Sequence, residues 1–376
     1  MRIIHVAPGI TESGIGVHVR ELTEALSRRG IETRIYTVGS IETGKLFIPS
    51  DPKGRITLGN LEILEFFGIN PPTFGGILPE ISNPFPHPIF VKRLSEEEGI
   101  IHIHGNEYFI TIVAALLSNI GRKPYVLSVH NVGKAFTDYS SIRFLRKVLN
   151  LSLFKYAIKH ADAVIAPTDE AANYVRKFQP RRVEKIRLAI DFRRFSGLRE
   201  RNGGYVLYLG RLDPVKEVDL LIDAAPLVLE RTDINFVIAG DGIERARLES
   251  LAVERGVEDK IRFLGKVRYA NVPKVLSGAA VFYAGRGSGY TLLESAAARR
   301  PIVCIEDEWS IYTIGGKSNA LFVPKDRRRL AEAILSILES PELAHSLIEG
   351  AYSFVSKNAS WDCVIEDYIR LYKSLE

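Results

Sequence analysis

The feature that most constrains the fold is a repeated alternation of short apolar segments with longer segments of helical periodicity. Residues 205–225, with the sequence YVLYLGRLDPVKEVDLLIDAA, are the clearest example. Residues 205–209 are typical of a buried strand, Asp213-Pro214 of a turn, and the apolar residues from Val218 onward recur at helical spacing. Strands that alternate with helices in this way predict parallel sheets covered by helices on both faces.

The alternation runs through both halves of the chain. The predicted strands are residues 3–7, 32–38, 100–104, 125–129, 163–166, 186–190, 205–209, 234–239, 261–264, 280–284 and 302–305. A polar, glycine-rich segment at 192–204 is typical of a linker, and 376 residues exceed what one hydrophobic core normally organises. We therefore expect an α/β protein with two doubly wound parallel-sheet domains, residues 1–195 and 196–359. Residues 40–90, rich in Gly, Pro and aromatics, predict a long functional loop.

Composition limits the class of protein. Hydrophobic residues make up 46% of the chain, and the longest apolar runs fall short of the roughly 20 residues that cross a bilayer. The net charge of +5 is a mild excess that does not imply nucleic acid. Cys304 and Cys363 lack metal-binding or disulfide spacing, and the N-terminus lacks an export signal, so a cytoplasmic location is expected. A single Met hints at a thermophile.

The predicted helix 141–160 combines a broad apolar face with a basic stripe that includes Arg143, Arg146 and Lys147. Such a helix can lie on the inner face of a membrane as a peripheral contact. Its apolar residues are equally typical of a helix that packs within a domain and leaves a cationic edge exposed.

Polar and glycine-rich residues follow several predicted strands. Arg211 and Lys216 lie in the turn after 205–209, where they predict a phosphate site or, alternatively, ordinary solvated charges. The glycine loop 13–16 lets backbone approach a ligand or simply forms a tight turn. Histidines end the strands 100–104 and 125–129, but few acids accompany them, so no metal site is expected.

Together these motifs resemble glycosyltransferase family 4. The resemblance rests on GRLDPVKEVDLLIDAA, FVIAGDGIERARLESLA, FLGKV and YTLLESAAARRPIV, supported by SGIGVHVREL, LSVHNV, ADAVIAPTDEAA and ASWDCVIEDYIRLY. It implies a GT-B fold, with two facing Rossmann-like domains, an inter-domain cleft, and a C-terminal helix 360–376 that packs back on the first domain. It also implies a retaining transferase of the EC 2.4 type that moves sugar from a nucleotide-diphosphate-sugar to a glycan, lipid or small-molecule acceptor, without metal or cofactor.

The resemblance also assigns residues. Arg211 and Lys216 would hold the donor diphosphate, His130 would lie near the transferred sugar, and Glu294, at a predicted helix start, would bind the ribose hydroxyls. His130 is alternatively a satisfied strand-end histidine, and Glu294 an acid favoured by the helix dipole. The other implied donor-binding residues are Gly14, Ile15, Gly16, Gly210, Gly240, Lys266, Val267, Arg286, Gly287, Ser288, Gly289, Tyr290 and Thr291.

Two departures from the family pattern bear on function. Arg286 stands where the first of two glutamates is usual, and Glu217 replaces a glycine. Arg286 predicts an anionic donor sugar such as a uronic acid, because a guanidinium donates hydrogen bonds and accepts none; alternatively it turns to solvent or pairs with a nearby acid. Three functions stay open: an active glycosyltransferase, another GT-B enzyme such as a nucleotide-sugar epimerase or a phosphorylase, and a non-catalytic nucleotide-sugar binder.

Overall fold

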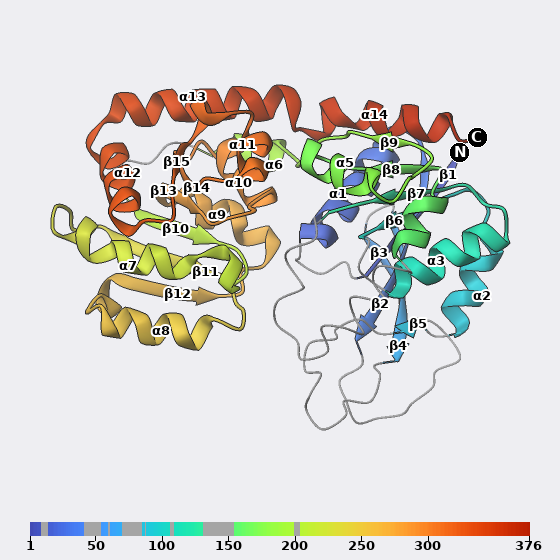
Figure 1. Ribbon diagram of the computed structural model, residues 1–376, viewed down its shortest axis with the longest axis horizontal. Coiled ribbons are helices and arrows are strands. Elements are labelled where there is room, and N and C mark those ends of the chain that lie inside the picture. The colour runs from blue at the N-terminus through green and yellow to red at the C-terminus, as the bar shows by residue number, and fades with distance from the viewer. Residues whose placement is uncertain are drawn as a thin grey trace. The chain divides into compact units, whose positions relative to one another are not determined.

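The computed structural model describes residues 1–8, 14–40, 54–58, 61–69, 85–86, 88–105, 109–130, 154–198 and 204–376. The chain divides into two compact units. The first contains Met1–Arg187 together with Val364–Glu376, and the second contains Leu188–Cys363. Each unit is an α/β layer structure with its own sheet (Figure 1).

The sheet of the first unit is mixed. Its strands are β1 (Arg2–Ala7), β2 (Glu32–Ser40), β3 (Gly54–Leu58), β4 (Leu61–Ile69), β5 (Phe85–Pro86), β6 (Ile100–His104), β7 (Tyr125–Ser128), β8 (Ala163–Ile165) and β9 (Val183–Glu184). The spatial order is β3-β4-β2-β1-β6-β7-β8-β9, with β5 also paired to β4. The pairs β3–β4 and β4–β5 are antiparallel and the rest parallel. The segment predicted as a long loop therefore contributes three strands, because LEILEFFGI is rich in Ile and Phe, residues typical of strands, despite the surrounding glycines and prolines.

Two sets of helices cover this sheet. They are α1 (Gly14–Arg28), α2 (Pro88–Glu96), α3 (Phe109–Ile120), a helical segment at residues 154–160, α5 (Asp169–Arg176) and α14 (Trp361–Lys373). On β1, Ile4 and Val6 join the core formed with α2, α3 and α5. His5, between them, points to the opposite face, where α1 and α14 lie. The alternation of a strand thus separates an apolar face from a histidine-bearing face.

The second unit has a parallel sheet of six strands. They are β10 (Tyr205–Leu209), β11 (Asn235–Ala239), β12 (Ile261–Gly265), β13 (Ala279–Ala284), β14 (Ile302–Ile305) and β15 (Leu321–Val323), in the spatial order β12-β11-β10-β13-β14-β15. Its helices are α6 (Arg193–Ser196), α7 (Val218–Leu229), α8 (Arg245–Glu254), α9 (Val272–Ser277), α10 (Tyr290–Ala297), α11 (Glu308–Ile314), α12 (Arg327–Glu339) and α13 (Pro341–Asn358). The edge strand β15 was not among the predicted strands.

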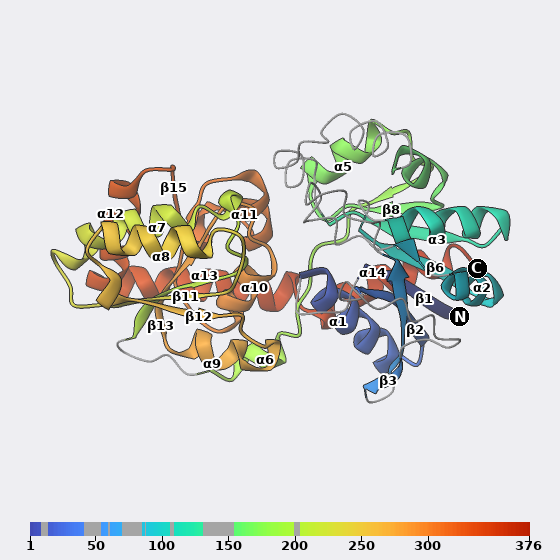
Figure 2. The same cartoon turned by 90° about the horizontal axis from the view of Figure 1, so that it is seen from below.

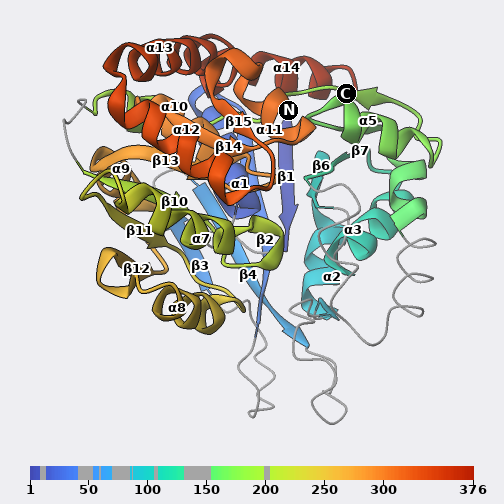
Figure 3. The ribbon, with the colours of Figure 1, turned by 60° about the vertical axis from the view of Figure 1, so that its left-hand side comes forward.

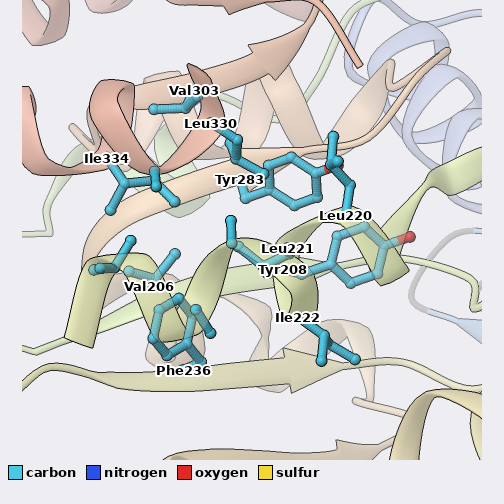
Figure 4. Close-up of a cluster of buried hydrophobic side chains, with 14 of the residues drawn as sticks. Val206, Tyr208, Leu220, Leu221, Ile222, Phe236, Tyr283, Val303, Leu330 and Ile334 are labelled. Atoms are coloured by element: carbon cyan, nitrogen blue, oxygen red, sulfur yellow. The ribbon is translucent and has the colours of Figure 1, made fainter. Parts of the chain in front are cut away.

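Two apolar cores fill the space on the two faces of this sheet. Helices α7, α8 and α12 pack on one face and α9 and α10 on the other (Figure 2), while α13 contributes residues to both cores. Helices α7 and α12 lie side by side, as Figures 1 and 3 show. Figure 4 shows Tyr208 and Tyr283 from neighbouring strands within the first of these cores, with ring centroids 6.2 Å apart. Burial of this apolar surface on both faces holds the strand ends in place.

The boundary between the units lies earlier than the predicted 195. Ile190 pairs with Ser360 and Phe195 is fully buried in the second core, so both belong to the second unit. The strand predicted at 186–190 is also absent, since the structure pairs β8 with Val183–Glu184 instead. The predicted linker contains the short helix α6, because Phe195 of this helix is buried in the core of the second unit.

The predicted helix 141–160 falls mostly outside the described residues, which show helix at 154–160; its basic stripe is therefore not described. Among the residues that the structure does describe, no helix is long and apolar enough to cross a membrane.

Candidate functional site

The carboxyl ends of β10 and β13 form a candidate site in the second unit. Strand β10 pairs with β11 on one side and β13 on the other, so the chain order reverses between β10 and β13. Ligands of open α/β sheets bind at such switch points, outside the carboxyl ends of the strands. Two segments leave here: residues 210–217, which we call the cationic turn, and residues 285–289.

These two segments touch through the backbone. A Cβ on Gly285 would lie 1.9 Å from the carbonyl oxygen of Lys216, so only glycine permits this approach. Lys216 Nζ then donates hydrogen bonds to the carbonyl oxygens of Arg286 and Gly287, both at 3.0 Å. The ammonium is thereby positioned over the loop after β13.

Burial and, to a smaller extent, the neighbouring Arg211 together lower the pKa of Lys216 to about 8, although Asp307 and Asp213 oppose the shift. Partial desolvation makes the ammonium a stronger partner for an anion than an exposed lysine. An anion at this position would in turn favour the charged form.

Arg211 is the exposed member of the cationic turn. Its Nη1 lies 2.8 Å from Asp213 Oδ2, and 58% of its side chain is accessible. Tyr208 donates to the backbone carbonyl of Arg211 at 2.6 Å, which anchors the main chain beneath the exposed guanidinium. A phosphate could replace Asp213 as the partner of this guanidinium at little cost, because exposed ion pairs are weak.

Glu217 occupies an unusual position directly after Lys216. Its φ of 51° is left-handed, which accounts for a glycine in the family pattern. The carboxylate is buried, with Oε1 3.3 Å from Lys325 Nζ and 3.6 Å from Arg286 Nε. Tyr283 donates to the Glu217 carbonyl at 2.7 Å. Arg286, predicted to face the donor sugar or to pair with an acid, is thus paired with Glu217.

Asp307, which the sequence did not single out, organises the segment 285–289. It accepts from the backbone N–H of Gly287 at 3.0 Å and caps α11 by accepting from Ser310 N–H at 2.9 Å. Ser288 closes the segment internally by donating to the carbonyl of Gly285 at 2.7 Å. The Asp-x-x-Ser spacing of a helix N-cap was the available signal.

Glu294 lies in the middle of α10 rather than at its start. The helix begins at Tyr290, directly after Gly289 and four residues before Glu294. Glu294 is 3% exposed, and Leu292 and Leu293 beside it enter the core. The dipole interpretation, which needs a first-turn acid, is therefore wrong. Thr291 and Tyr290 form the first turn instead.

The remaining predicted residues of this unit lie at neighbouring strand ends. Gly210 N–H donates to Ala239 O at 3.0 Å and Gly240 N–H to Gly265 O at 2.8 Å, so backbone hydrogen bonds join the ends of β10, β11 and β12. Lys266 and Val267 follow directly, the first exposed and the second half-buried. These positions share one edge of the sheet with Lys216.

In the first unit, the predicted glycine loop is helical. Gly14, Ile15 and Gly16 form the first turn of α1, and Gly16 is buried. Helix formation wins here because Val17, Val19 and Leu22 bury a continuous apolar stripe from that turn onward. Ser13 lies outside the described residues.

The first unit also gathers histidines. His130 follows β7 and lies with His5, His18, His102 and His104 in one cluster of ring contacts. Burial lowers the pKa of His5 to about 3 and that of His130 to about 4, and it lowers the pKa values of His18, His102 and His104 well below their ordinary value. His102 and His104 had been noted in the sequence, whereas His5 and His18 had not. Burial therefore favours the neutral form of all five rings.

Comparison with known proteins adds the family context. Residues 13–194 match the family described as Glycosyltransferase Family 4, and residues 190–354 match Glycosyl transferases group 1. The chain is 27% identical to the alpha-D-kanosaminyltransferase of Streptomyces kanamyceticus, over 95% of this chain and 98% of that protein.

Solved structures share the fold. Sucrose-phosphate synthase from Thermosynechococcus elongatus superposes with a TM-score of 0.76 at 19% identity, covering 100% of this chain and 99% of that one. HepE from Anabaena, solved in complex with UDP-glucose, superposes with a TM-score of 0.74 at 16% identity, covering 100% of both chains.

Proposed function

This chain is a glycosyltransferase of the GT-B, family 4 type, and from that premise we propose that it transfers a sugar from a nucleoside-diphosphate sugar to an acceptor hydroxyl with retention of configuration. The observation that carries the proposal is the position of Lys216. Its half-buried ammonium is fixed at the switch point of the donor-side sheet, with Arg211 beside it.

The two cations suit the charge that develops as the sugar leaves. When the glycosidic bond to the diphosphate breaks, negative charge grows on the phosphate oxygen that departs. Lys216 offers a preorganised ammonium and Arg211 a guanidinium able to bind two oxygens at once. Because these groups supply the positive charge, we propose that diphosphate recognition needs no divalent cation. HepE, which shares the fold, binds UDP-glucose, and this supports a nucleotide-sugar donor.

We assign the other donor contacts to residues of the second unit and to residues of the first unit. Buried Glu294 would accept hydrogen bonds from the ribose hydroxyls, and the backbone around Lys266 and Val267 would pair with the base. In the first unit, Gly14, Ile15 and Gly16 would approach the donor phosphate and sugar, and His130 would lie near the transferred sugar. The acceptor would be a glycan, a lipid or a small molecule.

Arg286 decides between this proposal and a non-catalytic binder. Because Arg286 is paired with Glu217, an acid lies beside the position where the family has a glutamate. With the charge of Arg286 already matched by Glu217, a neutral sugar is the simplest donor. An anionic sugar would have to displace Glu217 from Arg286. The second candidate, a nucleotide-sugar binder without turnover, rests on the same charge reversal.

The proposal is tested with a panel of nucleotide-sugars, neutral and uronic, incubated with and without acceptor alcohols and glycans and followed by mass spectrometry. Release of nucleoside diphosphate with a glycosylated acceptor is the expected result. An Arg286→Glu variant should lose uronic donors selectively if Arg286 binds their carboxylate. Equal effects on both donor classes exclude that role.

Binding of nucleoside diphosphate without turnover of any donor, by wild type and variants alike, would overturn the proposed activity in favour of the binder. Conversion of the sugar on the nucleotide, with no acceptor present, would indicate an epimerase.

A further inference from the structure

The histidine cluster of the first unit lies at the switch point of its own sheet. Strand β1 pairs with β2 on one side and β6 on the other, so the chain order reverses between β1 and β6. His5 and His102 are register partners across this pair, and His104 follows on β6. His18 comes from α1 and His130 from the end of β7. Four separate elements therefore converge on one set of imidazoles.

Two sets of three histidines each bring one ring nitrogen per residue within 4.8 Å of one another. These are His5, His102 and His104, and His18, His104 and His130. In the first set His102 is already saturated, since its Nδ1 lies 2.7 Å from Tyr372 Oη and its Nε2 lies 2.7 Å from Ser128 Oγ. A ligand there would break one of these bonds, so the second set is the better candidate.

Within the described part of the chain, two nitrogens of the second set are buried and have no hydrogen-bond partner. These are Nδ1 of His104 and Nε2 of His130. A buried polar atom without a partner costs free energy, and each such atom calls for an explanation. A cation between the rings would satisfy both atoms at once.

The second ring nitrogens of His104 and His18 each lie near a group that could act as the outer-shell partner of a metal ligand. His104 Nε2 lies 3.0 Å from His5 Nδ1, and His18 Nε2 lies 3.4 Å from Tyr368 Oη. Metal-ligating histidines usually donate their other ring N–H to such an acceptor, which fixes the tautomer and aims the lone pair at the metal. With His104 Nε2–H donated to His5, the lone pair of His104 lies on Nδ1, the atom without a partner.

We propose that His18 through Nδ1, His104 through Nδ1 and His130 through Nε2 bind a divalent first-row transition metal ion, of which Zn²⁺ is the best match. Three imidazoles with an open fourth position form a typical zinc arrangement, and imidazole ligands exclude Mg²⁺ and Ca²⁺, which prefer oxygen. His130 is only partly buried, so the fourth position would take water or another oxygen ligand. Burial keeps the imidazoles neutral, the form that binds metal.

The test uses the full chain without a polyhistidine tag, stripped of metal by chelation and dialysis. Zn²⁺ and Co²⁺ are then titrated by calorimetry, with the visible absorption of Co²⁺ as a direct report on nitrogen ligation. We expect one ion per chain. His130→Ala, at the least buried of the three positions, should weaken affinity at least ten-fold, and Tyr368→Phe about ten-fold through loss of the outer-shell hydroxyl.

His345→Ala is the matched control, because His345 is exposed on α13 in the second unit; it should leave affinity unchanged. Circular dichroism and thermal unfolding without metal establish that each variant is folded. If His104→Ala fails to fold, His130→Ala and Tyr368→Phe still decide the question. Wild type that binds Zn²⁺ and Co²⁺ no more tightly than folded His130→Ala overturns the site.

Discussion

The two units share a doubly wound plan but use their switch points differently. Between β10 and β13 the second unit presents charged groups, Lys216 and Arg211, each near an acid. Between β1 and β6 the first unit presents neutral imidazoles, whose pKa values are lowered by burial. We propose on this basis that the same topology serves an anion in one unit and a metal cation in the other, because the local side chains, and not the fold, set the sign of the ligand.

The largest expected effect is at Lys216. Replacing Lys216 by Ala should weaken nucleoside-diphosphate binding by about 1.5–3 kcal/mol, since a charge-assisted bond in a partly desolvated site is lost. Arg211→Ala should fall in the same range, toward its lower end because Arg211 is exposed. Calorimetric titration with a panel of nucleoside diphosphates measures both.

Lys260 provides a matched control for these variants. It lies at the amino-terminal end of β12, away from the switch point, where it pairs with Asp233. Lys260→Ala should bind like wild type. If Lys216→Ala and Arg211→Ala both keep the wild-type affinity for nucleoside diphosphate, the second unit has no anion site at these residues.

The second effect is a pH dependence of the same site. Because burial lowers the pKa of Lys216 to about 8, the ammonium is mostly protonated at pH 7 and mostly neutral at pH 9. Affinity for nucleoside diphosphate should therefore be retained below pH 8 and fall by up to about ten-fold as pH rises from 7 to 9. Lys216→Arg, which stays charged throughout, should flatten this profile. A decline of equal size in Lys216→Arg would assign the titration to another group.

A smaller effect concerns the pairing of Arg286 with Glu217. A double-mutant cycle with Glu217→Gln and Arg286→Gln should give a coupling of about 0.2–1 kcal/mol in the free energy of unfolding, because Arg286 is nearly half exposed at 3.6 Å from the carboxylate. Urea denaturation measures this coupling. Zero coupling would mean that Lys325 alone neutralises Glu217, and it would leave Arg286 available to a donor anion.

The smallest expected effect is that of a chelator on the second unit. EDTA should leave nucleoside-diphosphate affinity unchanged, because Lys216 and Arg211 supply the positive charge. The same treatment should release metal from the histidine cluster, which elemental analysis of the protein checks in the same sample. If EDTA lowers the affinity for nucleoside diphosphate and Mg²⁺ restores it, diphosphate binding requires a metal ion and the proposed metal-free anion site is wrong.

Much of the fold followed from local pattern. Residues 205–209 had the apolar character of a buried strand and the residues from Val218 onward had helical spacing, and both elements form where expected. The segment 61–69 was predicted as loop because Gly and Pro are abundant on both sides of its Ile- and Phe-rich sequence, and β15 is too short to show a period. Glu294 was placed at a helix start because no sequence signal located Gly289 as the last residue before α10.

By itself, the sequence determined the alternation of strands and helices, the family, and the cationic turn with Arg211 and Lys216, because these depend on residues close together in the chain. Only the tertiary structure decided which distant groups meet. It brought Glu217 to Arg286 and Lys325, and His18 to His104 and His130. The physical reason is that strand order and side-chain direction are set by burying the apolar faces of whole sheets, and no local pattern records which strand ends become neighbours.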